Sequence, residues 1–438
     1  MRLYNIKKYL LFLFYFSGLS AQGYSLDDCI QSALEGKKTV LSAQLGVISA
    51  EQGLKSSYSN LLPFVQATTG VGKTQSSNQE SYQFDYNNFS AGLSLSQKIY
   101  NGGQSLNQVK QARSALEIEK LNHRSTKIRV IENVIKSYYG LLKAQKLMNV
   151  AEKNLEMSDQ QLSLVKEKFD LGVVKRSDFL KAQVAQGQAK VEALNKQISL
   201  ENSRRKLFND MGLQDFGQTI NAIDEIWIMP VIPSSSEILD LLKTQNPSIL
   251  IAQNQVNLRE LSYKIVKGLR MPSLNSSINY SANGTNADEL VNALKDGWTL
   301  GMNLSLSVPI FTGNSLSIQQ QQAKISRQRS EFSYVTLLND LKVQAELIRE
   351  SLNNYAEIIP LNRAVIASAQ EDLNLVRERY SLGSATIVNL LDAQVSEISS
   401  SSALINTIHD ARMQHANLKA LLGTLDIEYQ IEEEYNVK

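Results

Sequence analysis

Residues 165–172 read VKEKFDLG, and residues 376–383 read VRERYSLG. The two stretches are separated by 211 positions (383 against 172), and the same offset relates IYNG at 99–102 to IFTG at 310–313. A constant offset requires the intervening elements to have equal length in both copies. The sequence therefore predicts a tandem structural duplication.

The ends of the chain and its middle divide the sequence further. Arg2, Lys7 and Lys8 precede an apolar run at 9–16 and a group of small residues, which is typical of a secretory signal. Two prolines and three consecutive serines near the middle indicate a connecting segment. We expect five parts: a signal peptide (1–21), a first repeat (22–212), a linker (213–236), a second repeat (237–424) and an acidic C-terminal tail (425–438).

Composition excludes several classes of protein. The 438 residues carry a net charge of +2, so no strong positive field indicates a nucleic-acid partner. Cys29 is the one cysteine, so no disulfide framework can form within the chain; we interpret it as a buried small apolar residue.

Each repeat is predicted to contain two very long helices joined by a tight turn. No proline occurs between Pro63 and Pro230, and about 65 residues of continuous helix span ~100 Å. Apolar residues recur at alternating steps of three and four, as in a coiled-coil seam. The first seam is Ile128, Ile131, Ile135, Tyr138 and Leu142, and the second is Leu338, Leu341, Ala345, Ile348, Leu352, Tyr355 and Ile359.

Two strands precede the long helices of each repeat. Pro63 and Pro272 open the first strand of each pair, and apolar and small polar residues alternate along all four strands. The second repeat has two extra residues between Pro272 and Trp298, which we assign to a loop tip. The apolar face of its last strand is the candidate lipid-facing row: Leu300, Met302, Leu304, Leu306 and Val308.

The alternation by itself fits two interpretations equally. Transmembrane barrel strands place apolar residues toward lipid and polar residues toward the lumen. An ordinary half-buried antiparallel sheet alternates in the same way. Four strands cannot close a barrel, so a membrane location would require several chains to pool their strands.

No constellation for catalysis, cofactor binding or metal binding is found. Residues 67–74 resemble a phosphate-binding loop, but no helix is predicted to follow them. The three histidines, His123, His409 and His415, lack partners at metal-ligand spacing and are expected on helix surfaces. The sequence therefore predicts neither an enzyme nor a cofactor.

The order of these features resembles that of the TolC family of outer-membrane efflux proteins over nearly the whole chain. In each repeat a helix ends near a proline step, at 62–63 or 271–272. A strand pair then closes at 100–103 or 311–314, and a helical hairpin turns at 169–172 or 380–383. The resemblance implies a mainly helical fold with membrane β-structure. It also implies that the long hairpins form a periplasmic α-barrel and that a homotrimer pools four strands per chain into a 12-stranded transmembrane barrel.

The family's role implies partners and a location. We expect a passive exit duct in the outer membrane of a Gram-negative bacterium, in contact with lipid. A periplasmic adaptor and an inner-membrane transporter would complete a tripartite system for small-molecule efflux. Two alternatives stay open: the exit duct of a type I protein secretion system, and a periplasmic coiled-coil scaffold or adaptor.

The resemblance also assigns roles to residues at the hairpin turns. The adaptor-docking tips are Leu171, Gly172, Val173, Leu382, Gly383 and Ser384. The periplasmic gate is Asp392, Tyr380, Asp178 and Asn389. Asp392 matches a constriction aspartate, Tyr380 a gating tyrosine and Asp178 its partner, whereas Asn389 stands where a second aspartate is common.

Two features of the gate depart from the family or stay ambiguous. Ala385 occupies the position of a tethering arginine in some members, and Lys175 or Arg176 is a candidate replacement. The alternative for Asp392 is a solvated carboxylate on a helix surface.

Overall fold

The computed structural model describes residues 23–77, 83–214, 221–224 and 227–429. The expected signal peptide at 1–21 and the last part of the expected tail lie outside the described residues. The chain divides into two compact units, one formed by 1–40, 127–241 and 343–438 and the other by 41–126 and 242–342. Among the described ranges, no helix combines the length and the apolar character needed to cross a membrane.

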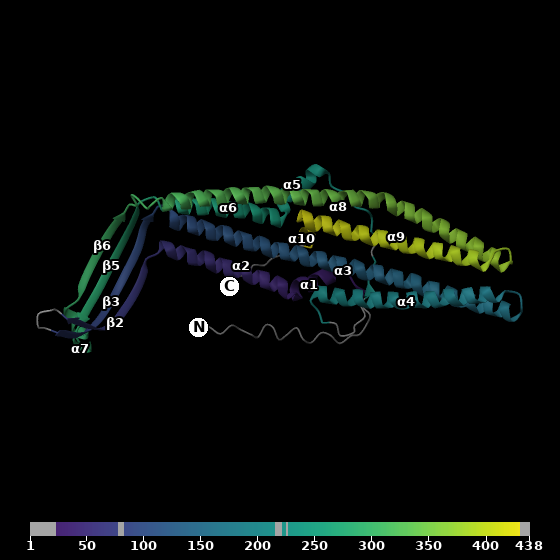
Figure 1. The fold of residues 1–438 in the computed structure, drawn as a ribbon, viewed down its shortest axis with the longest axis horizontal. Helices are drawn as coiled ribbons and strands as arrows, with labels where there is room; N and C mark the ends of the chain where they lie inside the picture. Colours follow the sequence, from purple (N-terminus) through teal and green to yellow (C-terminus); the bar gives the residue numbers. More distant parts are fainter. Residues whose placement is uncertain (1–22, 78–82, 215–220, 225–226, 430–438) are drawn as a thin grey trace. The chain divides into compact units, whose positions relative to one another are not determined.

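The duplication predicted from the sequence is confirmed by the lengths of the elements (Figure 1). Helices α3 and α8 both have 67 residues, α4 and α9 both have 36, and each bound in the second repeat lies 211 positions after its counterpart. The elements of the first repeat are β1 (Gly23–Tyr24), α1 (Leu26–Gly36), α2 (Lys38–Ser57), η2 (Tyr58–Leu61), β2 (Phe64–Ser77), β3 (Gln83–Asn101), α3 (Gln104–Asp170) and α4 (Arg176–Met211). Those that follow are β4 (Asn221–Ala222), α5 (Ser235–Gln245), α6 (Pro247–Gly268), β5 (Ser273–Gly284), α7 (Ala287–Asp296), β6 (Thr299–Ser307), α8 (Ser315–Ser381), α9 (Ile387–Leu422) and α10 (Leu425–Glu428).

The four long strands form one antiparallel sheet in the order β2-β3-β5-β6. The register places Leu93 opposite Tyr280 and Tyr280 opposite Leu300, so apolar residues form a continuous row on one face. The other face carries small polar residues, as in the neighbours Ser277 and Asn303. The alternation predicted from the sequence is therefore confirmed across the sheet, and the phosphate-loop resemblance at 67–74 lies inside β2.

Two details of the second strand pair differ from the prediction. Val308 lies beyond the end of β6, because Ser307 already pairs with Ser273, the first residue of β5, and Pro309 has no N–H to continue the ladder. The connection assigned to a loop tip contains the ten-residue helix α7. Asn286 caps this helix by accepting a hydrogen bond from the Glu289 N–H at 2.8 Å, and Asp288 and Glu289 complement its N-terminal dipole.

A close contact between two glycines joins α6 to the start of α3. Gly102 has φ +65°, and a Cβ there would lie 2.2 Å from the carbonyl oxygen of Gly268. A Cβ on Gly268 would in turn lie 2.6 Å from the Gly102 oxygen. Only residues without a side chain allow the backbones to approach this closely.

The other unit is built around the first seam. Ile128, Ile131, Ile135, Tyr138 and Leu142 are all buried, as the spacing predicted, and pack with Cys29, Leu207, Phe208 and Met211. The Tyr138 hydroxyl lies 3.0 Å from the Tyr24 carbonyl oxygen and accepts the N–H of Ile223 at 3.0 Å. This side chain therefore holds the parallel pair β1–β4 against α3.

The segment between the repeats is held by charge as well as by β-pairing. Arg412 of α9, 6% exposed, donates to Asp224 at 2.9 Å, and Lys146 of α3 lies 3.1 Å from the same carboxylate. Burial acts to raise the pKa of Asp224, but the hydrogen bonds from Arg412 and Lys146 outweigh it and lower that pKa. The Arg412 guanidinium also lies 5.8 Å from the centre of the Trp227 ring, within cation–π range.

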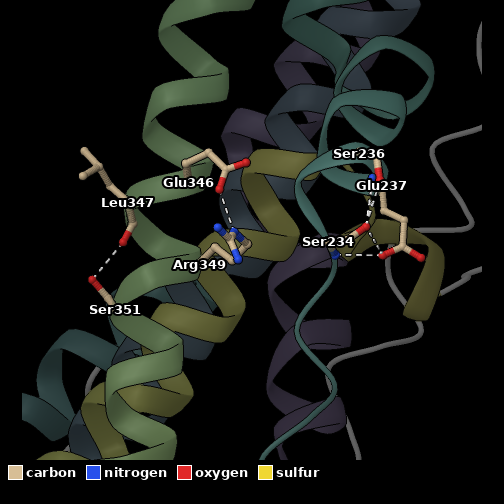
Figure 2. A network of polar contacts seen from close by, with 7 residues as sticks. All are labelled: Ser234, Ser236, Glu237, Glu346, Leu347, Arg349 and Ser351. Carbon is tan, nitrogen blue, oxygen red and sulfur yellow. Dashed lines mark hydrogen bonds and ion pairs between the residues drawn. The ribbon is translucent and has the colours of Figure 1, made fainter.

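The start of the second repeat is fixed by a capping box (Figure 2). Ser234 donates its N–H to Glu237 at 2.8 Å, and the Glu237 N–H donates back to the Ser234 hydroxyl at 3.4 Å. These two bonds satisfy backbone groups that the helix itself leaves unpaired, so α5 begins at Ser235. Figure 2 also shows the pair on α8 in which Arg349 donates to Glu346 at 2.6 Å.

The expectation that all three histidines lie on helix surfaces is wrong for two of them. His123 is 7% exposed and His409 is 3% exposed. Burial, together with the nearby Arg412 cation, lowers the pKa of His409 to about 4. A seam that admits some polar residues cannot be separated from a surface stripe by spacing alone.

The glycine contact gives a prediction for stability. Gly102→Ala would strain a positive φ and also force the Gly268 carbonyl away, so we expect a loss of roughly 3 kcal/mol or more. Gly313→Ala is the matched control, because Gly313 has φ +62° and no atom within 4 Å of an added Cβ. The control should lose only about 1 kcal/mol. Equal losses in thermal unfolding would contradict the role of the glycine contact.

Candidate gate and docking site at the hairpin tips

The two hairpin turns share one backbone design. Gly172 has φ +76° and Gly383 has φ +78°. In the first turn the Val173 N–H donates to the Lys168 carbonyl at 2.8 Å, and in the second the Ser384 N–H donates to the Arg379 carbonyl at 2.8 Å. This six-to-one bond with a left-handed glycine is the Schellman motif, which ends a helix sharply.

The tips expose apolar side chains to solvent. Leu171 is 79% exposed, Val173 is 70% exposed and Leu382 is 82% exposed. Gly172, Gly383 and Ser384 are also exposed. The six residues predicted to dock an adaptor are therefore all accessible, and their role in docking stays a prediction.

The returning helices begin differently. Thr386 and Asn389 form a capping box, in which the Asn389 side-chain oxygen accepts from the Thr386 N–H at 3.0 Å and from its hydroxyl at 2.5 Å. Asn389, placed at the gate from the sequence, therefore has its carbonyl oxygen committed to starting α9. In the first repeat Lys175 occupies the capping position without a side-chain cap, and Asp178 supplies the negative charge in the first turn of α4.

Tyr380 joins the two hairpins of one chain. It is 8% exposed and lies in an apolar cluster with Val165 and Ala182 of the first hairpin and with Ile387 and Leu390 of the second. Its hydroxyl is buried without a hydrogen-bond partner among the described residues. Burial raises the pKa of Tyr380, and the negative charge of Asp178 adds to that effect.

Two residues that the sequence analysis did not single out also link the hairpins. The Lys168 ammonium lies 4.9 Å from the centre of the Tyr380 ring, within cation–π range. Gln394 is 4% exposed and donates to Asn154 at 2.8 Å and to Ser158 at 3.3 Å, which ties α9 to α3. A signal for Gln394 existed, since Gln183 stands at the same place in the first repeat; Gln183, however, is exposed.

The remaining gate residues, Asp392 and Asp178, differ in how they relate to this cluster. Asp392 is exposed on α9, and among the described residues its carboxylate has no ion pair or hydrogen bond within the chain. Asp178 accepts a hydrogen bond from Ser177 at 3.4 Å. Within one chain, therefore, Tyr380 and Asp178 interact electrostatically, and Asp392 points to no partner.

Comparisons with known proteins identify the family to which this chain belongs. Residues 29–213 and 238–424 match the family described as outer membrane efflux protein, and the chain belongs to that family. It is thus an outer membrane protein of channel type, in a family not known for enzymes.

Particular relatives agree over almost the full length. The outer membrane protein TolC of Vibrio cholerae is 23% identical over 92% of this chain and 91% of its own. The outer membrane efflux protein BepC of Brucella suis is 22% identical over 96% of this chain and 91% of its own. The crystal structure of the Campylobacter jejuni CmeC outer membrane channel superposes with a TM-score of 0.82 at 17% identity, over 91% of this chain and 86% of that one.

The tip geometry gives a second prediction. In a double-mutant cycle between Lys168→Met and Tyr380→Leu, we expect a coupling of about 0.5–1 kcal/mol from the cation–π contact. The measurement is thermal unfolding of the detergent-solubilised protein. Lys166→Met is the control, since Lys166 is an exposed lysine on the same helix, two residues before Lys168.

Tyr380→Phe separates the ring from its hydroxyl. Because that hydroxyl is buried without a described partner, its removal should leave stability unchanged or raise it by about 1 kcal/mol. A loss of stability in Tyr380→Phe, or no coupling in the cycle, would contradict this account of the tip.

Proposed function

We propose that the protein is the exit duct of a tripartite export system, formed by a homotrimer in the outer membrane. A periplasmic adaptor and an inner-membrane transporter would deliver small molecules to it. One observation carries the proposal: in the single chain, two apolar surfaces are exposed to solvent. The first consists of apolar stripes on α4 and α8, and the second is the apolar face of the four-stranded sheet.

The first incomplete surface follows from the duplication. Within the chain, α3 of the first repeat contacts α9 of the second through Gln394 and through the cluster at Tyr380. The equivalent contact would be formed between two copies, with α8 of one copy packed against α4 of the next. Quasi-equivalent repeats of this kind favour a closed ring with cyclic symmetry.

Both helices of this proposed contact between copies, α4 and α8, carry exposed apolar residues. On α4 they follow steps of four, seven, three and four, which is a coiled-coil spacing. The α4 set is Leu180, Val184, Val191, Leu194 and Ile198, each between 47% and 60% exposed. The α8 set is Val343, Leu347, Ile358, Leu361 and Val365, each between 40% and 64% exposed.

The second incomplete surface is the sheet. Its apolar row is open to solvent in the single chain, with Met302 74% exposed, Leu304 64% exposed and Leu306 67% exposed. Four strands per chain in a trimer give twelve, enough to close a barrel with this row toward lipid and the small polar face toward the lumen.

The tips supply the remaining parts of the proposal. Leu171, Val173 and Leu382 would dock the adaptor. Asp392, exposed near the second tip, would converge with its copies into a cation-attracting ring. Closure would rest on Tyr380 through its ring and Lys168, with Asp178 as the charged partner from the first hairpin.

Position 385, where some family members have a tethering arginine, is an alanine, but two cations lie beside the first tip. Lys175 and Arg176 stand at the N-terminus of α4, where positive charge is unfavourable to the helix dipole. Both side chains are exposed. In the proposed duct, Lys175 or Arg176 would take the place of that arginine at the gate.

Oligomer assembly tests the proposal directly. Leu194→Lys would place a charge in the α4 stripe, and we expect the trimer to dissociate at a lower temperature than the unmodified trimer. Asn195→Lys adds the same charge at the adjacent exposed position and should leave the trimer intact. Assembly is measured by light scattering of the detergent-purified protein and by heating before electrophoresis.

The same purification separates the competing architecture. A mature protein that is released from cells without detergent and sizes as a monomer would reject the duct and favour a periplasmic scaffold. Equal stability of the two lysine variants would reject the α4–α8 contact between copies.

The gate gives a separate prediction. Asp392→Ala should raise single-channel conductance or weaken block by multivalent cations several-fold, because it removes the carboxylate ring. Asp372→Ala removes an exposed carboxylate of α8 and is the control. Unchanged electrophysiology in Asp392→Ala would assign Asp392 to the solvated helix surface.

A further inference from the structure

Helix α7 packs on one face of the sheet. A Cβ added to Gly284 would lie 2.5 Å from the Leu290 nitrogen, so helix and strand are in close contact there. The Tyr280 hydroxyl donates to the Leu294 carbonyl at 2.7 Å. Between them on β5, Ala282 is only 1% exposed. These three β5 residues alternate along the strand and therefore share one face.

The face that α7 covers is the apolar one. Tyr280 pairs with Leu93 on β3 and with Leu300 on β6, both members of the apolar row. The small polar residues that alternate with them, such as Asn279 and Ser281, point to the opposite face. The helix consequently lies on the side of the sheet that the proposed barrel turns toward lipid.

The helix has its own apolar side, which the sheet does not fully cover. Leu290 and Ala293 are partly buried, whereas Val291 is 51% exposed and Leu294 is 37% exposed. Trp298 follows directly, 49% exposed, with its ring centre 5.6 Å from that of Tyr280. The exposed polar residues of α7 are Asp288, Glu289, Asn292, Lys295 and Asp296. An amphipathic helix flanked by tryptophan and tyrosine is typical of a membrane–water interface.

The strand order distinguishes lipid from a second copy as the occupant. Copies of the chain would meet at the free edges of the sheet, which are β2 and β6. Helix α7 instead contacts β5 and β3, the two inner strands. The helix therefore lies mainly over the inner strands of the apolar face, whereas a neighbouring protomer would pair with the edge strands.

We propose that α7 is an interfacial helix that lies on the outer lipid surface at the mouth of the barrel. Val291, Leu294 and Trp298 enter the boundary of the acyl chains, and Asp288, Asn292 and Lys295 face the headgroups and water. This inference rests on the proposed barrel. It assigns to the second repeat an anchor built into the connection between β5 and β6.

Site-directed spin labelling tests the inference on the whole trimer in vesicles of phosphatidylethanolamine and phosphatidylglycerol. Labels are placed by Val291→Cys, by Asn292→Cys as the adjacent polar control and by Met302→Cys as the strand reference. All are made in a Cys29→Ala background, since Cys29 is the one cysteine of the chain. Collisions with oxygen, which partitions into lipid, are compared with collisions with a water-soluble nickel complex.

We expect the oxygen-to-nickel collision ratio at Val291 to exceed that at Asn292 several-fold and to approach that at Met302. A lipid-exposed Met302 with a water-exposed Val291 overturns the interfacial helix and leaves the barrel standing. A Val291 label that neither reagent reaches also overturns it, because a neighbouring copy then covers α7. A water-exposed Met302 overturns the barrel itself. If Val291→Cys does not assemble, Leu294→Cys reports on the same side of the helix.

Discussion

The strands β2 and β6 each present one edge whose backbone N–H and C=O groups pair with nothing in the described part of the chain. Unpaired edges beside an exposed apolar face cannot persist in water without inviting further strands, and in lipid each unpaired group would cost several kcal/mol. Closure through further copies removes both difficulties at once. A ring in which first and second repeats alternate requires helices of equal length in the two repeats, and the chain meets this requirement.

The same quasi-symmetry explains where the two repeats differ. Each contact that the first hairpin makes with the second inside the chain has an equivalent that the proposed neighbour provides. The inner contact is specific, with a buried Gln394 and the Lys168–Tyr380 pair. The outer face of α4 is a plain apolar stripe. Such a division would let closure of the tip be controlled within each chain while the ring is held by apolar packing.

The two strand pairs also diverge. The first strand pair, β2–β3, extends its ladder to Ser77 and Gln83, whereas the ladder of the second pair, β5–β6, ends at Ser281 and Thr299. In the connection between β5 and β6, the chain forms α7, which packs on the face of the sheet. Small residues, Ala282 and Gly284, make room for the helix where larger apolar residues would prevent it.

Repeat length, strand alternation, the helical seams and the glycine turns are determined by the sequence alone, because each is a local or periodic pattern. Leu300, Met302, Leu304 and Leu306 of the predicted lipid-facing row lie on β6, whereas Val308 follows its end because of where β5 begins; their contact with lipid stays a prediction. The helix α7, the buried His409 and the Lys168–Tyr380 contact could not be derived in this way, since burial and pairing across distant segments depend on tertiary packing. The tertiary structure also decided that Asn389 caps α9 and that the Tyr380 ring lies beside the Lys168 ammonium, because only three-dimensional proximity shows which groups satisfy one another.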